Sequence, residues 1–307
     1  MKKQVPAVRR GAWGRRDALR LGGVGLATLG LAACSRVDGG DGGEGGGSGS
    51  TLDRLREQGF VKVGLANEIP FGFVDDSGNP AGQSPAVAKA VFEELGVPEI
   101  QAESVSWDGL IPGLKSNQFD VIAAGMFITP ERCQQVAFSE PTATSPEAFM
   151  VAEGNPHGIQ HFEDFVDNPD LRLAVLNGSV EQTYANHFGV PEDQQELITN
   201  QTAGYELLEA GRADAMSMLS VSHEYLLQER GGPFEVTEPF FPVIDGQEEK
   251  GWGGLCFRQD ENALLEEVNR VIAEFKENGR LLELGQDWGF TEADLPDDTT
   301  TAELCEG

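Results

Sequence analysis

The fold turns on Phe119-Asp120-Val121-Ile122-Ala123-Ala124, an apolar run typical of a buried strand, and on Gly125-Met126-Phe127-Ile128-Thr129-Pro130-Glu131-Arg132, which follows it. The second segment brings an aromatic side chain and a guanidinium to the carboxyl end of the strand, where open α/β sheets bind their ligands. We therefore expect this edge to bind the carboxylate of a small solute. The alternative is a purely structural turn, in which Thr129 caps a helix, Pro130 starts it and Glu131 suits its positive end.

The first 33 residues have the pattern of an export signal, with a basic region followed by a short apolar run over residues 21–33. The run closes with Leu31-Ala32-Ala33-Cys34, which resembles a lipoprotein signal box, and Arg15-Arg16-Asp17-Ala18-Leu19 resembles a twin-arginine export signal. We expect residues 1–33 to be a signal peptide and Cys34 to be lipidated. An ordinary cleaved signal with an unmodified cysteine is the alternative.

Residues 38–50 consist almost entirely of Gly, Asp, Glu and Ser, a composition that cannot bury apolar surface. We expect residues 34–50 to be a flexible, lipid-anchored tether and the folded part to begin near Thr51, on the extracytoplasmic face of the cell membrane. The chain carries 22 basic and 51 acidic side chains, a formal net charge of −29 at pH 7. That surface argues against nucleic acid as a partner and against membrane contact other than through the lipid.

The cysteines of an exported chain suggest a disulfide once Cys34 is assigned to lipid. Cys256 sits in the apolar run Gly254-Leu255-Cys256-Phe257, as a buried small residue would, so we expect Cys133 to pair with Cys305. The cysteine spacing resembles no zinc site, and the four histidines show no ligand pattern. We expect neither a metal nor a cofactor.

Hydrophobic periodicity predicts two α/β units. The first has a helix over 51–58, strands over 60–65, 100–107 and 119–124, and helices over 84–95, capped by Ser84 and Pro85, and 110–114. The second has strands over 171–176, 196–199 and 213–218, with helices over 180–188 and 204–210. Extended segments over 147–151 and 251–258 connect them, and helices over 262–276 and 280–288 form the tail.

This order predicts an α/β fold with two lobes, each a mostly parallel sheet flanked by helices, joined by two hinge crossings. We expect lobe 1 to comprise residues 51–146 and 252–307 and lobe 2 to comprise residues 147–251. Closure would take place over 147–151 and 251–257, so that a ligand is buried between the lobes.

Five segments of the chain resemble the solute-binding proteins of ABC importers that have the type II periplasmic-binding fold, and in particular the members that bind ectoine and hydroxyectoine. The segments are Asn67-Glu68-Ile69-Pro70-Phe71-Gly72, Leu110-Ile111-Pro112-Gly113-Leu114-Lys115, the run from Ile122 to Cys133, Val136-Ala137-Phe138-Ser139-Glu140-Pro141 and Thr300-Thr301-Ala302-Glu303-Leu304-Cys305. The resemblance covers nearly all of residues 51–307. It implies a small-molecule solute and ABC permease subunits as partners.

The resemblance also implies roles for individual residues. Arg132 follows the Thr-Pro pair and would bind the ligand carboxylate, since a guanidinium matches a carboxylate in two parallel hydrogen bonds. The delocalised cation of ectoine would lie in an aromatic box, with an acid on its ring nitrogens. The residues at the matching positions are Phe71, Trp107 and Phe127 for the box, Glu68 for the acid, Gly125 at the same edge, and Ser179 in the turn Asn177-Gly178-Ser179-Val180-Glu181.

Trp107 stands where the resemblance leads us to expect a tyrosine. Each of these residues also has a structural alternative: Phe71 and Phe127 as core, Glu68 as a solvated loop charge, and Arg132 in an ion pair with Glu131 or Glu140.

Amino-acid binders of this fold usually carry an acid for the ligand's α-ammonium five residues after the aspartate of Gly-Arg-x-Asp. Here Gly211-Arg212-Ala213-Asp214 is present, but that position is Leu219. This favours a ligand without a primary amine, because a buried ammonium without a partner is unfavourable.

Two alternatives remain open. One is a polar amino-acid-binding protein of the same family. The other is a cyclohexadienyl-dehydratase-like enzyme on the same fold, with Glu68 and Glu181 as candidate acids. The lipid anchor and the absence of a nucleophile-base pair, a phosphate loop or a metal motif favour a binding protein over an enzyme.

Overall fold

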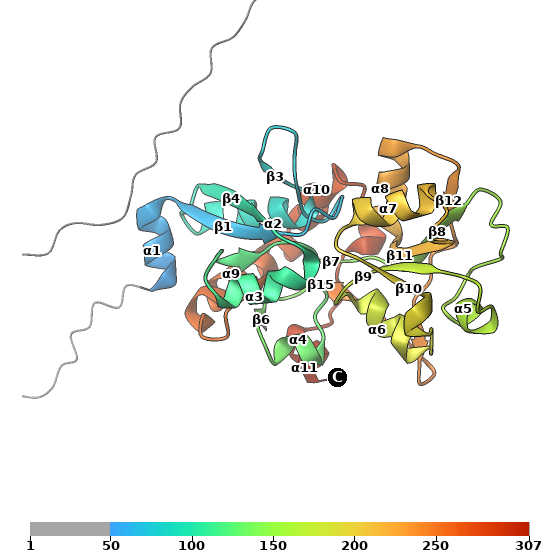
Figure 1. Ribbon diagram of the computed structural model, residues 1–307. Helices are drawn as coiled ribbons and strands as arrows, with labels where there is room; N and C mark the ends of the chain where they lie inside the picture. Colours follow the sequence, from blue (N-terminus) through green and yellow to red (C-terminus); the bar gives the residue numbers. More distant parts are fainter. Residues whose placement is uncertain (1–49, 307) are drawn as a thin grey trace, which may run out of the picture. The chain divides into compact units, whose positions relative to one another are not determined.

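Two five-stranded sheets organise the computed structural model, which describes residues 50–306 (Figure 1). The predicted signal peptide, lipidation site and most of the tether lie outside the described residues. The first sheet has the order β4-β1-β5-β16-β6 and the second β10-β9-β11-β8-β12. Their strands are β1 (Phe60–Leu65), β4 (Glu99–Ser104), β5 (Val121–Ile122), β6 (Ala137–Phe138) and β16 (Cys256–Phe257), and β8 (Glu147–Ala152), β9 (Leu173–Leu176), β10 (Gln195–Ile198), β11 (Ala215–Leu219) and β12 (Phe234–Val236).

Each sheet is mostly parallel, as predicted, with one strand reversed. In the first sheet β4, β1 and β5 pair in parallel and β16 lies antiparallel between β5 and β6. In the second sheet β10, β9 and β11 pair in parallel and β8 lies antiparallel between β11 and β12. The parallel strands therefore end at one edge of each sheet, where ligands of open α/β sheets bind.

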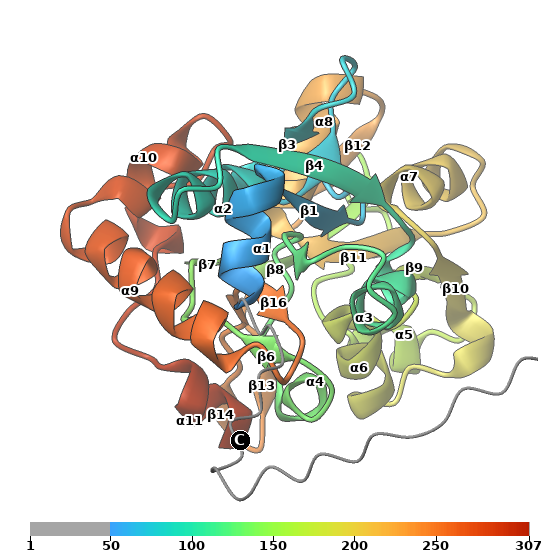
Figure 2. The same ribbon diagram turned by 90° about the vertical axis from the view of Figure 1, so that its left-hand side faces the viewer.

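Helices cover both sheets. They are α1 (Thr51–Gln58), α2 (Gln83–Glu94), α3 (Leu110–Lys115), α4 (Pro130–Cys133), α9 (Asn262–Glu277), α10 (Arg280–Gln286) and α11 (Thr301–Glu306) with the first sheet, and α5 (Glu163–Asp167), α6 (Val180–His187), α7 (Gln201–Glu209) and α8 (Ser220–Arg230) with the second. Apolar residues of α1, α2, α9 and α10 form one core with β1 and β5, and Figure 2 shows α2, α9 and α10 lying together. Short hairpins and turns complete the chain: β2 (Phe73–Val74), β3 (Pro80–Ala81), β13 (Val243–Ile244), β14 (Gln247–Glu248) and the 3₁₀ turns η1 (Trp107–Gly109), η2 (Glu192–Gln194) and η3 (Glu292–Asp294).

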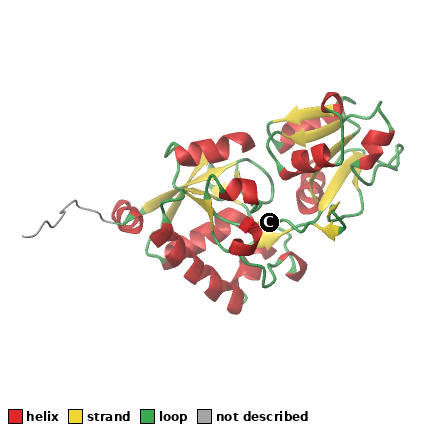
Figure 3. Cartoon of the chain, turned by 90° about the horizontal axis from the view of Figure 1, so that it is seen from below, coloured by secondary structure: helices red, strands yellow, loops and turns green. Residues whose placement is uncertain are grey.

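The two chain segments that run between the sheets each contain a short strand, and these two strands pair with each other. β7 (Ala143–Thr144) and β15 (Trp252–Gly253) form an antiparallel pair in which Thr144 lies opposite Trp252. The sequence placed the first crossing at residues 147–151, and that was wrong, because these residues are β8, a central strand of the second sheet. Periodicity could not separate the two, since a crossing and a buried strand are both short extended runs. We use lobe 1 for residues 50–146 and 252–306 and lobe 2 for residues 147–251; Figure 3 shows both.

Other predictions need correction at the level of single elements. Gly82, not Ser84, is the N-cap residue of α2, so Ser84 and Pro85 lie inside its first turn. Trp107 begins the turn η1 and does not belong to the preceding strand, which ends at Ser104. The sequence missed α5, α8 and β12.

The predicted cysteine pair is joined in the structure. Cys133 at the end of α4 and Cys305 in α11 form a disulfide with a Cα–Cα distance of 5.7 Å, whereas Cys256 is buried and free. The bridge ties the tail of the chain to the helix that carries Arg132. Within residues 50–306 no helix has the length and apolar character needed to span a membrane.

Candidate ligand-binding site

Arg132 is a buried cation held by local structure. Thr129 caps α4 and its Oγ1 accepts a hydrogen bond from the Arg132 N–H at 3.3 Å, so the helix-cap interpretation is correct and compatible with binding. The guanidinium donates from Nη1 to the Phe127 carbonyl oxygen at 2.9 Å and from Nη2 to the Gly178 carbonyl oxygen at 3.2 Å. No carboxylate of the described residues lies within 4.0 Å of it, which excludes the predicted ion pairs, and burial lowers its pKa.

Three hydrogen bonds reach from lobe 1 to one turn of lobe 2. Arg132 and the Trp107 Nε1–H, the latter at 3.2 Å, both donate to the Gly178 carbonyl oxygen. Beside them the Asn177 Nδ2–H donates to Asp108 Oδ2 at 2.9 Å. The guanidinium carbon of Arg132 lies 5.7 Å from the centre of the Trp107 ring. These contacts hold the lobes in a closed arrangement.

The sequence-predicted residues converge on an inner pocket between the lobes. Its lining is Glu68, Trp107, Gly125, Phe127, Arg132, Leu176, Ser179, Val180, Glu181 and Leu219, which includes all the predicted ligand-binding residues except Phe71. The side chains nearly fill the pocket, leaving about 10 Å³, which is about the space of one water molecule. An incoming solute therefore requires the lobes to part.

Phe71 lies behind the pocket wall instead of in it. Its ring packs edge-on against Phe290, with ring centres 5.1 Å apart. Gly125 has a positive φ of 68°, and a Cβ there would collide with the Phe71 ring. The glycine is therefore required by the close approach of Phe71, and of the predicted aromatic box only Trp107 and Phe127 line the pocket.

Glu68 is buried and bonded across the lobes. Ser222 Oγ of α8 donates to Glu68 Oε1 at 2.9 Å, so this residue is not a solvated loop charge. Burial raises the pKa of Glu68 to about 8, and the nearby charge of Glu181 adds to the rise. A positively charged group next to this buried carboxyl would stabilise its ionised form.

Ser179 and Glu181 come from the first turn of α6. Ser179 is the N-cap residue, and its Oγ accepts a hydrogen bond from the Gln182 N–H at 3.2 Å. Glu181 is buried in the pocket lining, and burial raises its pKa although the Ser179 hydroxyl and the Arg132 charge lower it. The lobe 2 wall thus carries the acid Glu181, which the sequence analysis considered only as a candidate acid of the enzyme alternative.

Glu147 is a buried acid beside the inner pocket that the sequence interpretation missed. It opens β8 directly opposite Leu219 of β11, and only 2% of its surface is exposed. Neither carboxylate oxygen has a hydrogen-bond partner among the described residues. The signal was present, since Glu147 is the only charged residue of the otherwise apolar run Glu147-Ala148-Phe149-Met150-Val151. The missing acid at Leu219 therefore does not leave this wall without a carboxyl group.

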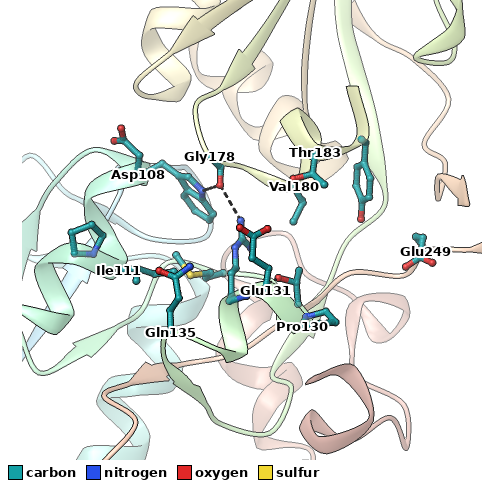
Figure 4. A pocket seen from close by; sticks show the side chains of 15 residues that line it. Asp108, Ile111, Pro130, Glu131, Gln135, Gly178, Val180, Thr183 and Glu249 are labelled. Carbon is teal, nitrogen blue, oxygen red and sulfur yellow. Dashed lines mark hydrogen bonds between the residues drawn. The ribbon is translucent and has the colours of Figure 1, made fainter. Parts of the chain in front are cut away.

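An outer cavity of about 600 Å³ adjoins the inner pocket and shares Trp107, Arg132 and Val180 with it (Figure 4). Three acids lie on its lining, namely Asp108, Glu131 and Glu249. Arg132 is the only basic residue there. The approach to the site is thus negatively charged and favours solutes that carry a positive group.

The described residues hold no cluster of three or more His, Cys, Asp or Glu side chains arranged to bind a metal ion. The inner pocket is lined by one guanidinium, two buried carboxyl groups and two aromatic rings. Such a set can bind a compact ligand that carries both a carboxylate and a cation.

Residues 61–292 match the family of bacterial extracellular solute-binding proteins, family 3. The chain is 32% identical to the probable amino-acid ABC transporter periplasmic-binding protein y4tE of Sinorhizobium fredii (strain NBRC 101917 / NGR234), over 83% of this chain and 86% of the relative. Among solved structures it is similar to EhuB in complex with hydroxyectoine, with a TM-score of 0.77 and 33% identity over 83% of this chain and 97% of that one. It is also similar to the ancestral amino acid-binding protein AncCDT-1, a precursor of cyclohexadienyl dehydratase, with a TM-score of 0.68 and 31% identity over 78% and 99%.

These similarities confirm the type II periplasmic-binding fold and a binding role in place of an enzymatic one. They also place the protein outside the cytoplasm, with a small-molecule ligand and the permease of an importer as its partners. The chain belongs to the bacterial extracellular solute-binding proteins of family 3 and serves an ABC importer.

Proposed function

We propose that the protein captures the compatible solute ectoine or hydroxyectoine for its importer. The observation that carries the proposal is the composition of the inner pocket. Arg132 offers a guanidinium fork for a carboxylate, while Glu68 and Glu181 offer acids for a cation. Trp107 and Phe127 add aromatic surface, which suits a flat and weakly hydrated cation.

The contracted pocket also favours a compact ligand. A cyclic solute that carries its cation in the ring needs less space than an amino acid with a long side chain. The similarity to EhuB, solved with hydroxyectoine, supports the same ligand class. Binding would proceed by closure of the lobes about the paired segments β7 and β15.

Titration calorimetry tests this proposal. We expect ectoine and hydroxyectoine to bind, and proline betaine and a panel of amino acids to bind more weakly. Small-angle scattering should show compaction when ectoine is added. Tight binding of an amino acid with no heat from ectoine would refute the ligand assignment.

A polar amino acid is the second candidate, and one observation favours it. Glu147 lies opposite Leu219, the position where amino-acid binders carry their acid, and Glu181 lines the same pocket. An α-ammonium could therefore meet a carboxylate here even though residue 219 is a leucine. The relative y4tE, named as a probable amino-acid transporter component, is consistent with this ligand class.

We also propose that the protein is anchored by lipid at Cys34 and exported through its twin-arginine segment. The support is the sequence alone, in Leu31-Ala32-Ala33-Cys34 and Arg15-Arg16. Globomycin treatment or a Cys34→Ala substitution should release the protein from the membrane fraction. A lysine pair in place of Arg15 and Arg16 should block export by that route. Unchanged partitioning of the Cys34→Ala protein would refute the anchor.

A further inference from the structure

Glu147 is a buried acid with no internal partner. The residue is 2% exposed, and its two carboxylate oxygens accept no hydrogen bond from any described residue. Its backbone is firmly paired, because its N–H and C=O both bond to Phe240 and it stands in register with Leu219. A buried carboxyl without partners is strongly unfavourable when ionised. Its presence therefore needs an explanation.

The register places Glu147 against the wall of the inner pocket. Residues directly opposite each other in an antiparallel pair project to the same face, with their Cβ atoms roughly 5 Å apart. Leu219 lines the pocket, and Glu147 is its cross-strand neighbour. Phe149 and Val151, on the same face of β8, pack in a core with residues of α5 and α6. Glu147 thus lies at the pocket end of the surface that α6 covers.

Groups from two other elements act on it electrostatically. α6 contributes Glu181 and Tyr184, and the loop after β1 contributes Glu68. The charges of Glu181 and Glu68 raise the pKa of Glu147 beyond the effect of burial, and the charge of Glu147 in turn raises the pKa of Tyr184. Arg132 is the only buried Lys or Arg among the described residues.

Three buried carboxyl groups therefore act on one another, and only Glu181 is also stabilised by the charge of Arg132. Like charges at close range in a dry site repel strongly, which disfavours ionisation of all three together. A positively charged ligand group is the species that would make ionisation favourable.

We propose that Glu147 is a specificity-determining carboxylate that, together with Glu181, balances the positive group of the ligand from the lobe 2 side. It supplies from β8 the negative charge that position 219 lacks. The inference rests on the proposed function only in requiring a ligand that carries a cation. As this cation enters, a proton leaves the carboxyl groups for the solvent, and the carboxylate formed in this way balances the positive group of the ligand.

Calorimetry of the folded protein at pH 7, in buffers of different ionisation enthalpy, tests the inference with ectoine and L-arginine as ligands. For the wild type we expect release of up to about one proton, seen as a binding enthalpy that depends on the buffer. Glu147→Gln keeps the shape of the side chain and removes its charge. It should raise Kd by about tenfold or more and reduce the proton release.

Glu153→Gln is the matched control. Glu153 follows directly after β8, is exposed, and loses the same charge on substitution. We expect its Kd and proton release to equal those of the wild type. Glu147→Asp keeps a carboxylate, so it should retain the proton release and serves as the second variant if Glu147→Gln does not fold.

The outcomes separate this inference from the ligand assignment. If the wild type bound L-arginine but not ectoine, only the ectoine proposal would be refuted. The variants would then be measured with L-arginine as the ligand. A Glu147→Gln protein with wild-type affinity and proton release would overturn the inference, as would a Glu147→Asp protein without proton release. Failure of both cations to bind the wild type would overturn both proposals.

Discussion

The two walls of the site have opposite chemistry. The lobe 1 wall presents Arg132, Trp107 and Phe127, whereas the lobe 2 wall presents Glu181 of α6 and Leu219, which pairs with Glu147 on the sheet. A ligand that carries both charges would therefore be oriented as the lobes close, its carboxylate toward lobe 1 and its cation toward lobe 2. The same contacts would then serve both ligand recognition and closure of the lobes.

Glu68 is the exception that connects the walls. It belongs to lobe 1 by sequence, but it accepts its hydrogen bond from Ser222 of lobe 2, and the charge of Glu181 raises its pKa. Functionally it belongs with the acids of lobe 2. It closes the acidic side of the pocket opposite Arg132.

Removing the lobe 1 cation should have the largest effect. Arg132→Ala leaves the ligand carboxylate buried without a partner, and we expect Kd to rise about 100-fold or more, corresponding to about 2.7 kcal/mol or more. Arg132→Lys should lose less, because it keeps the charge but not the planar fork. Titration calorimetry with ectoine measures both. An Arg132→Ala loss smaller than that of Phe127→Ala would contradict the assigned role.

The aromatic wall should contribute less than the guanidinium. Phe127→Ala removes a ring that lines the pocket, and we expect Kd to rise about tenfold, since each aromatic contact with a cation contributes about 0.5–2 kcal/mol. Phe71→Leu is the matched comparison, because Phe71 packs on Phe290 behind Gly125. It should lower the melting temperature and leave Kd nearly unchanged. If Phe71→Leu and Phe127→Ala reduced the affinity equally, Phe71 would have to be counted among the residues that line the pocket.

The buried acids of the pocket should make the free energy of unfolding depend on pH. The folded protein keeps the Glu68 proton up to a pKa of about 8, whereas the unfolded chain loses it near 4.5. The unfolded state therefore binds fewer protons between these values, and the free energy of unfolding falls as pH rises through the window. Glu68→Gln should make this fall shallower in denaturant titrations. Some slope should remain, because burial raises the pKa of Glu147 and Glu181 in the same direction. An unchanged slope would contradict a buried, protonated Glu68.

The contact between the walls should have the smallest effect. Asn177→Ala removes the hydrogen bond to Asp108 at the rim, and one such bond contributes about 0.5–1.5 kcal/mol. We expect Kd to rise about threefold to tenfold, with a larger radius of gyration for the ligand-free protein in scattering. Thr183→Ala, elsewhere on the outer cavity, serves as the control and should leave both values unchanged. A wild-type scattering profile for Asn177→Ala would show that this bond does not favour closure.

The lobe 1 residues that the sequence proposed for the site lie together in the inner pocket, apart from Phe71, because they follow strands along the chain. Thr129 and Pro130 define the start of α4, and the position of Arg132 follows from that turn. The strand β1 and the helix α1 begin and end where periodicity places them. The prediction failed for Phe71, because a residue in a loop can face either side of the backbone and nothing local decides which.

Local patterns along the chain are enough to predict the α/β order of elements, the disulfide partners and the edge that carries Arg132, since each depends on neighbouring residues or on burial patterns. The position of Glu147 beside the pocket wall follows only from the assembled fold. Its place there depends on the register between β8 and β11, whose paired residues Glu147 and Leu219 are far apart along the chain. The opposite charge of the two walls likewise exists only when both sheets are assembled, because the acids come from separate elements of the two lobes.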